Sequence, residues 1–231
     1  MPEKIIGILG GMGPEATIDL FYKIIKFTPA EKDQDHIRII IDNNPKIPDR
    51  TAAILGKGED PLPALQETAR NLEKAGADFI IIPCNTAHSF LSSIQKSVKI
   101  PILNMIEETA KETIKRISQI QKVGLLTSKG IYKTEIYHQY FNKFNIEVVS
   151  LEEKDKEEVM KVIYAVKAGD LSNEIKGNIL KITQKLIDKG AEAIVAGCTE
   201  IPLIIKEGDV SVPLIDSTQV LAKAAVQKAK L

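Results

Sequence analysis

The sequence predicts an α/β fold made of two related halves, and three observations favour this class. Short apolar segments typical of buried strands alternate with longer segments whose apolar residues recur at helical spacing. The strand segments are almost continuously apolar, as expected for parallel sheets covered by helices on both faces. Landmarks of the first half return in the same order in the second half. At 231 residues, the chain is long enough for one large domain or two small ones.

The first half is expected to begin with a strand at residues 4–9, which is rich in isoleucine and stops at glycines. A helix should follow at 15–27, where Ile18, Phe21 and Ile25 recur at helical spacing. Gly76 should end a later helix. The remaining elements expected here are strands at 36–41, 78–82 and 101–104 and helices at 62–75 and 90–98.

The second half is expected to repeat this order. A long helix at 106–120 leads to a strand at 122–126, which resembles the strand at 4–9. Gly190 should end a helix just before another strand, as Gly76 does. The remaining elements expected here are helices at 131–144, 155–168, 173–189 and 218–230 and strands at 146–150, 193–196 and 212–216.

Three pairs of landmarks indicate an internal repeat. They are Gly7 and Gly124, 117 residues apart, Cys84 and Cys198, 114 apart, and Pro101 and Pro213, 112 apart. Offsets that drift so little predict two related α/β halves. We assign residues 1–105 and 216–231 to the first half, which carries Cys84, and residues 106–215 to the second, which carries Cys198.

Composition excludes several classes of function. The 31 basic and 31 acidic residues balance, so nothing indicates binding to nucleic acid or to an anionic membrane. No apolar run approaches the roughly 20 residues of a membrane helix, and the start lacks a signal-peptide pattern. We therefore expect a cytoplasmic protein whose thiols stay reduced, which disfavours a structural disulfide.

Cys84 and Cys198 are the only cysteines, and each comes eight residues after a glycine in the same phrase, Gly-Ala-acid followed by an apolar run. Both positions lie just past a strand end, where parallel α/β sheets bind ligands. A free cysteine has a pKa of about 8.5, so thiol chemistry at neutral pH requires that nearby amides or charges lower it. The pair predicts a two-sided thiol site if the halves face each other. The alternative is that each cysteine is a small buried apolar residue.

The turn Gly10-Gly11-Met12-Gly13 follows the first strand and opens a helix, where backbone amides could approach an anion. Its glycines fit neither the dinucleotide fingerprint nor a P-loop. The alternative is a tight turn without a ligand.

Four polar residues are further candidates, each with a plain structural alternative. Arg50 lies in the loop-like stretch at 43–61 and could clamp a carboxylate, or could be a solvated loop arginine. Lys167 falls at a helix end, where a cation is favourable in any case. His88 could contact the Cys84 loop or simply be packed. Glu200 could orient a group or bind a substrate ammonium, or be an ordinary acid at a helix start. With three histidines and no metal-like spacing, we expect no zinc site.

Four segments together resemble the aspartate/glutamate racemase family, most of all its cofactor-independent aspartate racemases. They are Gly10-Gly11-Met12-Gly13-Pro14-Glu15-Ala16-Thr17, the stretch from Asn43 to Thr51, Pro83-Cys84-Asn85-Thr86-Ala87-His88, and Gly197-Cys198-Thr199-Glu200-Ile201. The resemblance implies two pseudo-twofold-related domains with four-stranded parallel sheets, an active site in the interdomain cleft, no cofactor, and commonly a homodimer.

The resemblance also implies roles for individual residues. One cysteine takes the α-proton of the amino acid as a thiolate, and the other gives a proton to the opposite face; Cys84 and Cys198 match these positions. Arg50 and Lys167 match positions that hold the side-chain carboxylate. Asn85, Thr86 and Thr199 match loops that bind the α-carboxylate, and Met12 lines the cleft in the family.

We therefore expect an aspartate racemase that acts on a small-molecule substrate without pyridoxal phosphate. A glutamate racemase or a broader amino-acid racemase is the alternative within the family. A non-catalytic amino-acid-binding module is an alternative of another class. A thiol redox protein is disfavoured because the sequence has no Cys-x-x-Cys.

Overall fold

The computed structural model describes residues 3–231, which divide into two compact units. The first unit extends to Glu108 and is completed by Thr218–Leu231, and the second is Thr109–Ser217. The chain therefore leaves the first unit within helix α5 (Met105–Arg116) and returns at the start of helix α11 (Ser217–Ala229). The sequence had placed these crossings after residues 105 and 215.

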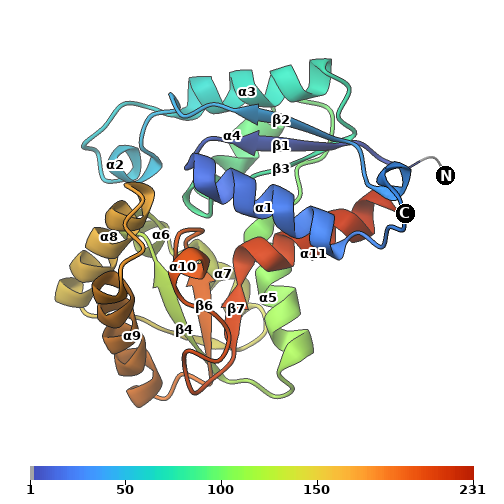
Figure 1. The fold of residues 1–231 in the computed structure, drawn as a ribbon. Coiled ribbons are helices and arrows are strands. Elements are labelled where there is room, and N and C mark those ends of the chain that lie inside the picture. Colours follow the sequence, from blue (N-terminus) through green and yellow to red (C-terminus); the bar gives the residue numbers. More distant parts are fainter. Residues whose placement is uncertain (1–2) are drawn as a thin grey trace. The chain divides into compact units, whose positions relative to one another are not determined.

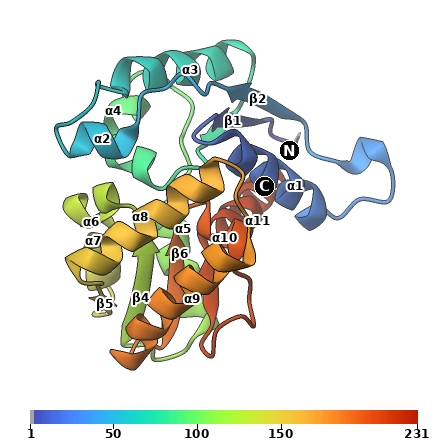
Figure 2. The same ribbon diagram turned by 60° about the vertical axis from the view of Figure 1, so that its left-hand side comes forward.

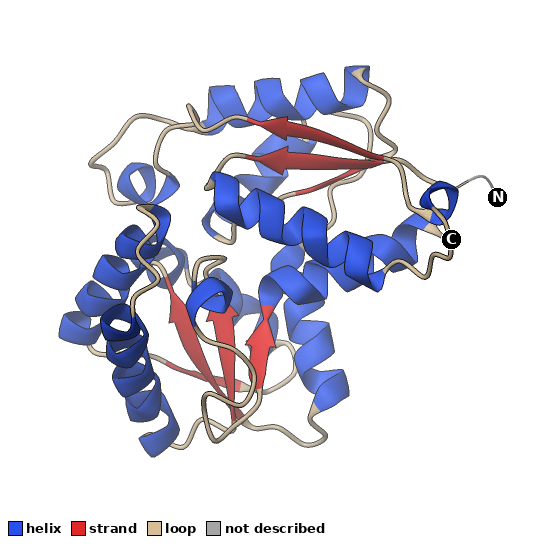
Figure 3. Cartoon of the chain, in the orientation of Figure 1, coloured by secondary structure: helices blue, strands red, loops and turns tan. Residues whose placement is uncertain are grey.

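The first unit is built on three parallel strands in the order β2 (Ile39–Asn43), β1 (Ile6–Gly10), β3 (Phe79–Ile81) (Figure 3). In this register Ile8 of β1 is paired with Ile41 and with Ile81. Helices α1 (Pro14–Phe27) and α11 pack on one face of the sheet, and α3 (Leu62–Lys74) and α4 (Leu91–Gln95) pack on the other (Figure 1). Burial of both faces explains why β1 and β3 carry no polar side chain, whereas the edge strand β2 is partly exposed and ends in Asp42-Asn43.

Three short helical segments lie in the loops of the first unit: η1 (Asp33–Asp35), α2 (Arg50–Ile54) and η2 (Thr86–Phe90). The α2 helix falls within the stretch at 43–61 that the sequence analysis left as a loop. It is nucleated by Asp49, whose carboxylate accepts a hydrogen bond from the Ala52 amide at 2.7 Å. An N-cap of this kind was readable in the sequence, but a five-residue helix has no apolar periodicity to reveal it.

The expected fourth strand of the first unit is reduced to a single parallel bridge between Ile80 and Ile102. The Leu103 amide donates to the Ile80 carbonyl at 2.9 Å, but Pro101 has no amide hydrogen with which to extend the ladder. The prediction of a four-stranded sheet is therefore wrong for this unit, although the segment lies beside β3 as expected.

The second unit has four parallel strands in the order β5 (Glu147–Val149), β4 (Lys122–Thr127), β6 (Ala193–Gly197), β7 (Leu214–Asp216). Helices α8 (Glu153–Lys167), α9 (Asn173–Asp188) and α10 (Ile201–Ile204) share one apolar core with the sheet (Figure 2). The single helix expected at 131–144 is two helices, α6 (Lys129–Thr134) and α7 (Ile136–Asn142). Glu135 between them has a φ of 53°, which breaks the helix.

The repeated Gly-Ala-acid phrase has the same structural role in both units. Gly76 and Gly190 end α3 and α9 with φ angles of 95° and 92°, a conformation that favours glycine. The acid that follows then accepts backbone amides at the start of the neighbouring strand: Asp78 from Ile5 at 2.6 Å, and Glu192 from Lys122 at 3.1 Å. In both units the phrase therefore ends a helix and holds the start of the neighbouring strand, and each cysteine follows eight residues after the helix-ending glycine.

The proline landmarks also correspond. The Ile80 amide donates to the Pro101 carbonyl and the Ile194 amide donates to the Pro213 carbonyl, both at 2.9 Å. The two halves that the spacing indicated therefore share this backbone hydrogen bond at corresponding positions. Across residues 3–231, no helix combines the length and the apolar character that crossing a membrane requires.

Candidate active site

Each unit ends one of its strands in a buried, unpaired cysteine. Cys84 comes after β3 and Cys198 comes directly after β6, and both side chains are buried. The carboxyl ends of parallel strands are where such sheets place ligands. The structure therefore puts both predicted catalytic residues where the fold class expects chemistry.

In the first unit, Cys84 shares an apolar cluster with Met12 and Ile47. Helix α2, which begins at Arg50, packs against η2, which begins at Thr86. Met12, Arg50, Cys84, Asn85 and Thr86 are thus gathered at one end of the first sheet, and all five are buried.

Arg50 carries a buried charge without an acidic partner. One guanidinium nitrogen, Nη1, donates to the carbonyls of Ile47 and Pro48 at 3.1 and 2.9 Å, while Nε is buried without a hydrogen-bond acceptor. The side chain is only 7% exposed, and within residues 3–231 it forms no ion pair. A buried guanidinium is stable only when paired or hydrogen-bonded, so this site favours an incoming anion. The alternative of a solvated loop arginine is wrong.

The glycine-rich turn is held by its own helix and by a neighbouring loop. The Gly11 amide donates to Thr17 Oγ1 at 2.9 Å, so this amide is not available to a ligand. Gly11 has a φ of 94°, and a Cβ there would lie 2.3 Å from the Asn44 carbonyl carbon. Only glycine permits this close approach, which sets Met12 toward the Cys84 cluster.

His88 is tied to the backbone and is not a free base. Its Nδ1 lies 2.9 Å from the Cys84 carbonyl and its Nε2 accepts the Met105 amide at 3.1 Å. Because one partner can only accept and the other only donates, the ring is the neutral tautomer with its proton on Nδ1. Burial lowers the pKa of His88 to about 4, against the weaker raising effect of the Cys84 and Leu103 carbonyls. A nucleophilic pair of Cys84 with His88 is thereby excluded.

In the second unit, Cys198 lies beside two charged side chains. Its Sγ donates to Glu200 Oε2 at 2.9 Å, and the Thr199 hydroxyl donates to the same oxygen at 3.3 Å. Lys167 is the last residue of α8, which packs against α10. Lys167, Cys198, Thr199 and Glu200 are thus gathered at the end of the second sheet.

These surroundings raise the pKa of Cys198 well above its ordinary value. Burial is the largest cause and the charge of Glu200 is the next, while the positive charge of Lys167 opposes them. The expectation that the sequence context would lower the pKa of each thiol is therefore wrong for Cys198. The helix that follows Cys198, α10, has only four residues, and a carboxylate oxygen of Glu200 lies 2.9 Å from Sγ.

Sequence reasoning missed Thr127, whose hydroxyl donates to the Gly197 carbonyl at 2.5 Å and so fixes the peptide before Cys198. A threonine at the end of β4 was the only available signal. Within residues 3–231, no group of three or more His, Cys, Asp or Glu residues is placed to hold a metal ion.

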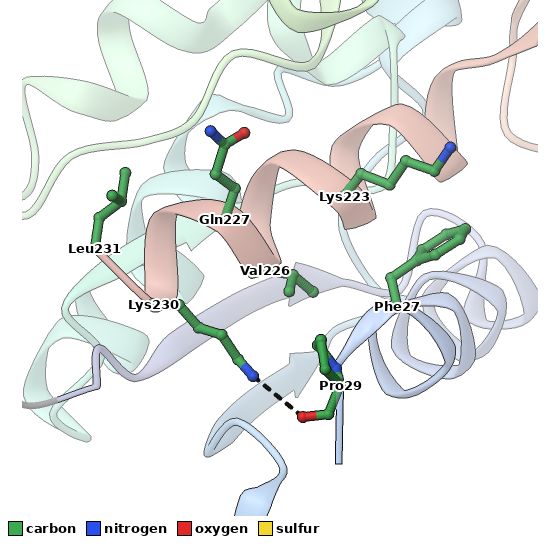
Figure 4. A pocket seen from close by; sticks show the side chains of 7 residues that line it. All are labelled: Phe27, Pro29, Lys223, Val226, Gln227, Lys230 and Leu231. Atoms are coloured by element: carbon green, nitrogen blue, oxygen red, sulfur yellow. Dashed lines mark hydrogen bonds between the residues drawn. The ribbon is translucent and has the colours of Figure 1, made fainter.

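A pocket of about 400 Å³ lies elsewhere in the first unit, between the end of α1 and α11 (Figure 4). Its lining is Phe27, Pro29, Lys223, Val226, Gln227, Lys230 and Leu231. Helix α1 starts beyond the carboxyl end of β1 and runs back, so Phe27 lies at the opposite end of the sheet from Cys84. This pocket is separate from the cysteine site.

The profile of the Asp/Glu/Hydantoin racemase family matches residues 9–225 of the sequence. The chain belongs to this family. The family resemblance read from the cysteine, glycine and Arg50 segments is therefore confirmed.

Individual relatives agree with this assignment. An aspartate racemase from Picrophilus torridus is 36% identical, with a TM-score of 0.83 over 98% of this chain and 94% of that one. An aspartate racemase homologue from Pyrococcus horikoshii is 30% identical, with a TM-score of 0.77 over 99% of this chain and all of that one. The broad specificity amino-acid racemase RacX of Bacillus subtilis is 31% identical over 96% of both chains. The chain is thus an amino-acid racemase of this family, with the expected α/β fold and parallel sheets.

Proposed function

We propose that the protein interconverts L- and D-aspartate without a cofactor, using Cys84 and Cys198 as the two acid–base groups. The observation that carries this proposal is the buried, free cysteine that follows a strand in each unit. The charge of Lys167 acts on Cys198, and the buried Arg50 lies in the same unit as Cys84. The 36% identity to an aspartate racemase supports the choice of substrate. The proposed reaction requires that both cysteines reach the same bound amino acid.

In the proposed reaction, a cysteine thiolate on one face of the substrate takes the α-proton. An S–H bond forms, the Cα–H bond breaks, and its electron pair passes onto Cα and the adjoining carboxylate. The other cysteine then gives its thiol proton to the opposite face of Cα. The amino acid is inverted, the two cysteines have exchanged protonation states, and no oxidant or reductant is needed.

The surroundings of the two thiols suggest which one is protonated in the free enzyme. The hydrogen bond from Cys198 to Glu200 stabilises the thiol, because a thiolate there would stand 2.9 Å from a carboxylate oxygen. Within the part of the chain that the structure describes, no acidic side chain forms a hydrogen bond with Cys84. We assign Cys198 as the proton donor, which leaves Cys84 to take the first α-proton.

The remaining site residues bind and orient the substrate in this proposal. Arg50 and Lys167 hold the side-chain carboxylate, and Asn85, Thr86 and Thr199 hold the α-carboxylate. Met12 forms part of the apolar wall beside Cys84. An α-proton beside a carboxylate is only weakly acidic, and proton transfer by itself supplies about 10²–10⁴-fold. Most of the acceleration must come from donors placed on the developing charge in a site that excludes water.

Proton exchange with solvent tests the proposal. The protein is incubated with L-aspartate in deuterated buffer. The two enantiomers are then separated, and the deuterium content of each is measured by mass spectrometry. Early in the reaction, D-aspartate should carry one deuterium at Cα while the remaining L-aspartate stays protiated, because the proton comes from the opposite face. Replacing either cysteine by alanine should abolish the reaction, and added pyridoxal phosphate should change nothing. Deuterium appearing first in the L-aspartate would contradict the two-base mechanism.

A broader amino-acid racemase is a second candidate, favoured by the 31% identity to RacX. Assays of glutamate, alanine and lysine beside aspartate decide between them, and the aspartate proposal requires the largest kcat/KM for aspartate. A non-catalytic binding module predicts binding of aspartate without deuterium incorporation. The proposal includes a homodimer, which light scattering of the purified protein tests.

A further inference from the structure

The His88 ring joins two backbone segments of the first unit. Its Nδ1 donates to the carbonyl of Cys84 and its Nε2 accepts the amide of Met105. The side chain is only 2% exposed, so both bonds are shielded from water. One bond ends on the residue that carries the thiol, and the other ends on the first residue of α5.

The Met105 bond belongs to the cap of α5. The first amides of a helix have no partner within the helix. In α5 the next two amides, of Ile106 and Glu107, donate to Asn104 Oδ1 at 3.0 and 3.2 Å. The amide of Met105 is left for His88. Asn104 and His88 thus share the start of this helix, and a neutral imidazole is the form that can accept there.

The helix that His88 caps carries the chain out of the first unit. The division between the units falls between Glu108 and Thr109, one turn after Met105. The first turn of α5 belongs to the unit of Cys84, and the rest of α5 belongs to the unit of Cys198. His88 therefore stands between the Cys84 loop and the covalent connection to the second unit.

We propose that His88 is a positioning residue that fixes Cys84 relative to α5, so that the thiol keeps its place with respect to the connection that leads to Cys198. The inference rests on the proposed two-cysteine function. It assigns His88 no proton transfer, since both ring nitrogens are already engaged. The need for it follows from the chemistry, because a displacement of about 1 Å of a reacting group can cost on the order of 10²-fold in rate.

Two conservative substitutions test the two hydrogen bonds of His88 one at a time. An asparagine amide reaches the place of Nδ1, so His88→Asn can keep the bond to Cys84 and loses the bond to Met105. A glutamine amide reaches the place of Nε2, so His88→Gln can keep the bond to Met105 and loses the bond to Cys84. His138, the half-buried histidine of the second unit, provides the matched control as His138→Gln.

The first measurement is the rate at which iodoacetamide alkylates each cysteine, followed by peptide mass spectrometry. In His88→Gln the rate at Cys84 should rise several-fold while the rate at Cys198 stays the same. Cys198 is an internal control, because a variant that merely unfolds exposes both thiols. An unchanged rate at Cys84 in His88→Gln would overturn the proposal, and so would an equal rise at both cysteines.

The second measurement is racemisation. Both His88→Asn and His88→Gln should lower kcat by about 10–100-fold with little change in KM, because substrate contacts remain while the thiol is displaced. A wild-type kcat in His88→Asn would show that the bond to α5 is not needed. It would overturn the proposal that His88 must fix Cys84 relative to α5. A wild-type protein that racemises no amino acid would instead defeat the proposed function, and the alkylation contrast would still decide whether His88 holds Cys84.

Discussion

Cys198 Sγ donates a hydrogen bond to Glu200 Oε2 at 2.9 Å, so the second catalytic candidate is held as a thiol beside a buried carboxylate. Glu200→Gln keeps the size and an acceptor oxygen but removes the charge that helps raise the pKa of Cys198. Burial still raises that pKa, and Lys167 still lowers it. Alkylation of Cys198 should therefore become several-fold faster near pH 8, with Cys84 unchanged. Glu207→Gln, at an exposed acid that pairs with Arg116, is the control. A slower reaction at Cys198 in Glu200→Gln would contradict this electrostatic relationship.

Arg50 should discriminate between substrates with one and two carboxylates. Its guanidinium is buried without an ion pair among residues 3–231, so replacing it removes a strong site for the side-chain carboxylate. Arg50→Gln should raise KM for aspartate by about 10²-fold, in line with losses of a few kcal/mol for buried charge pairs. Activity toward alanine, if detectable, should change little. Arg70→Gln, at an exposed position of α3, should leave both substrates unaffected. An equal loss for aspartate and alanine would mean that Arg50 does not bind the side chain.

The sequence predicted the parts of this fold that depend on local pattern. Continuous apolar segments, helix-ending glycines and the spacing of Cys84 and Cys198 were enough to infer two parallel α/β units. The shortening of the strand at 101–104 to one bridge has a single sign in the sequence, Pro101, which has no amide hydrogen for the ladder. The break at Glu135 is hidden, since nothing in its neighbourhood marks a positive φ.

In the candidate site, too, local pattern could be predicted and tertiary contacts could not. Residue types and spacing identified the cysteines and Arg50, but not what each one contacts. The raised pKa of Cys198 depends on burial and on the direction of the Glu200 side chain, and both are tertiary facts. His88 was left between two interpretations until its two backbone partners, 4 and 17 residues away, were known.

Gly11 should be intolerant of any side chain. Its φ of 94° and the 2.3 Å approach of a Cβ to the Asn44 carbonyl carbon combine backbone strain with a clash against main chain. Gly11→Ala should lower the free energy of unfolding by about 2–4 kcal/mol, measured by urea denaturation. Gly177→Ala is the matched control, because Gly177 lies inside α9 and a Cβ there meets nothing within 4 Å. The control should be more stable than wild type by about 0.5–1 kcal/mol. Equal effects in the two variants would contradict the close packing of the Gly11 turn.

His88 should make the protein sensitive to mild acid. Its pKa is lowered to about 4 in the folded protein by burial, so between pH 6.5 and 4 the unfolded chain binds a proton that the folded chain does not. Stability from this group is therefore present at and above pH 6.5 and is lost as the pH falls toward 4. Between pH 7 and pH 5 the expected loss is about 2 kcal/mol.

The measurement is the free energy of unfolding in urea at pH 7 and pH 5 for wild type, His88→Gln and His138→Gln. His88→Gln should start less stable at pH 7 but should lose about 2 kcal/mol less than wild type on going to pH 5, because glutamine does not titrate. His138 is half-buried and its pKa is also lowered, by burial and Lys156 against Glu135. His138→Gln should therefore reduce the pH dependence of the free energy of unfolding by less than His88→Gln does. If His88→Gln and wild type lose the same stability between the two pH values, His88 is not the neutral, doubly bonded ring that caps α5 and holds the Cys84 carbonyl.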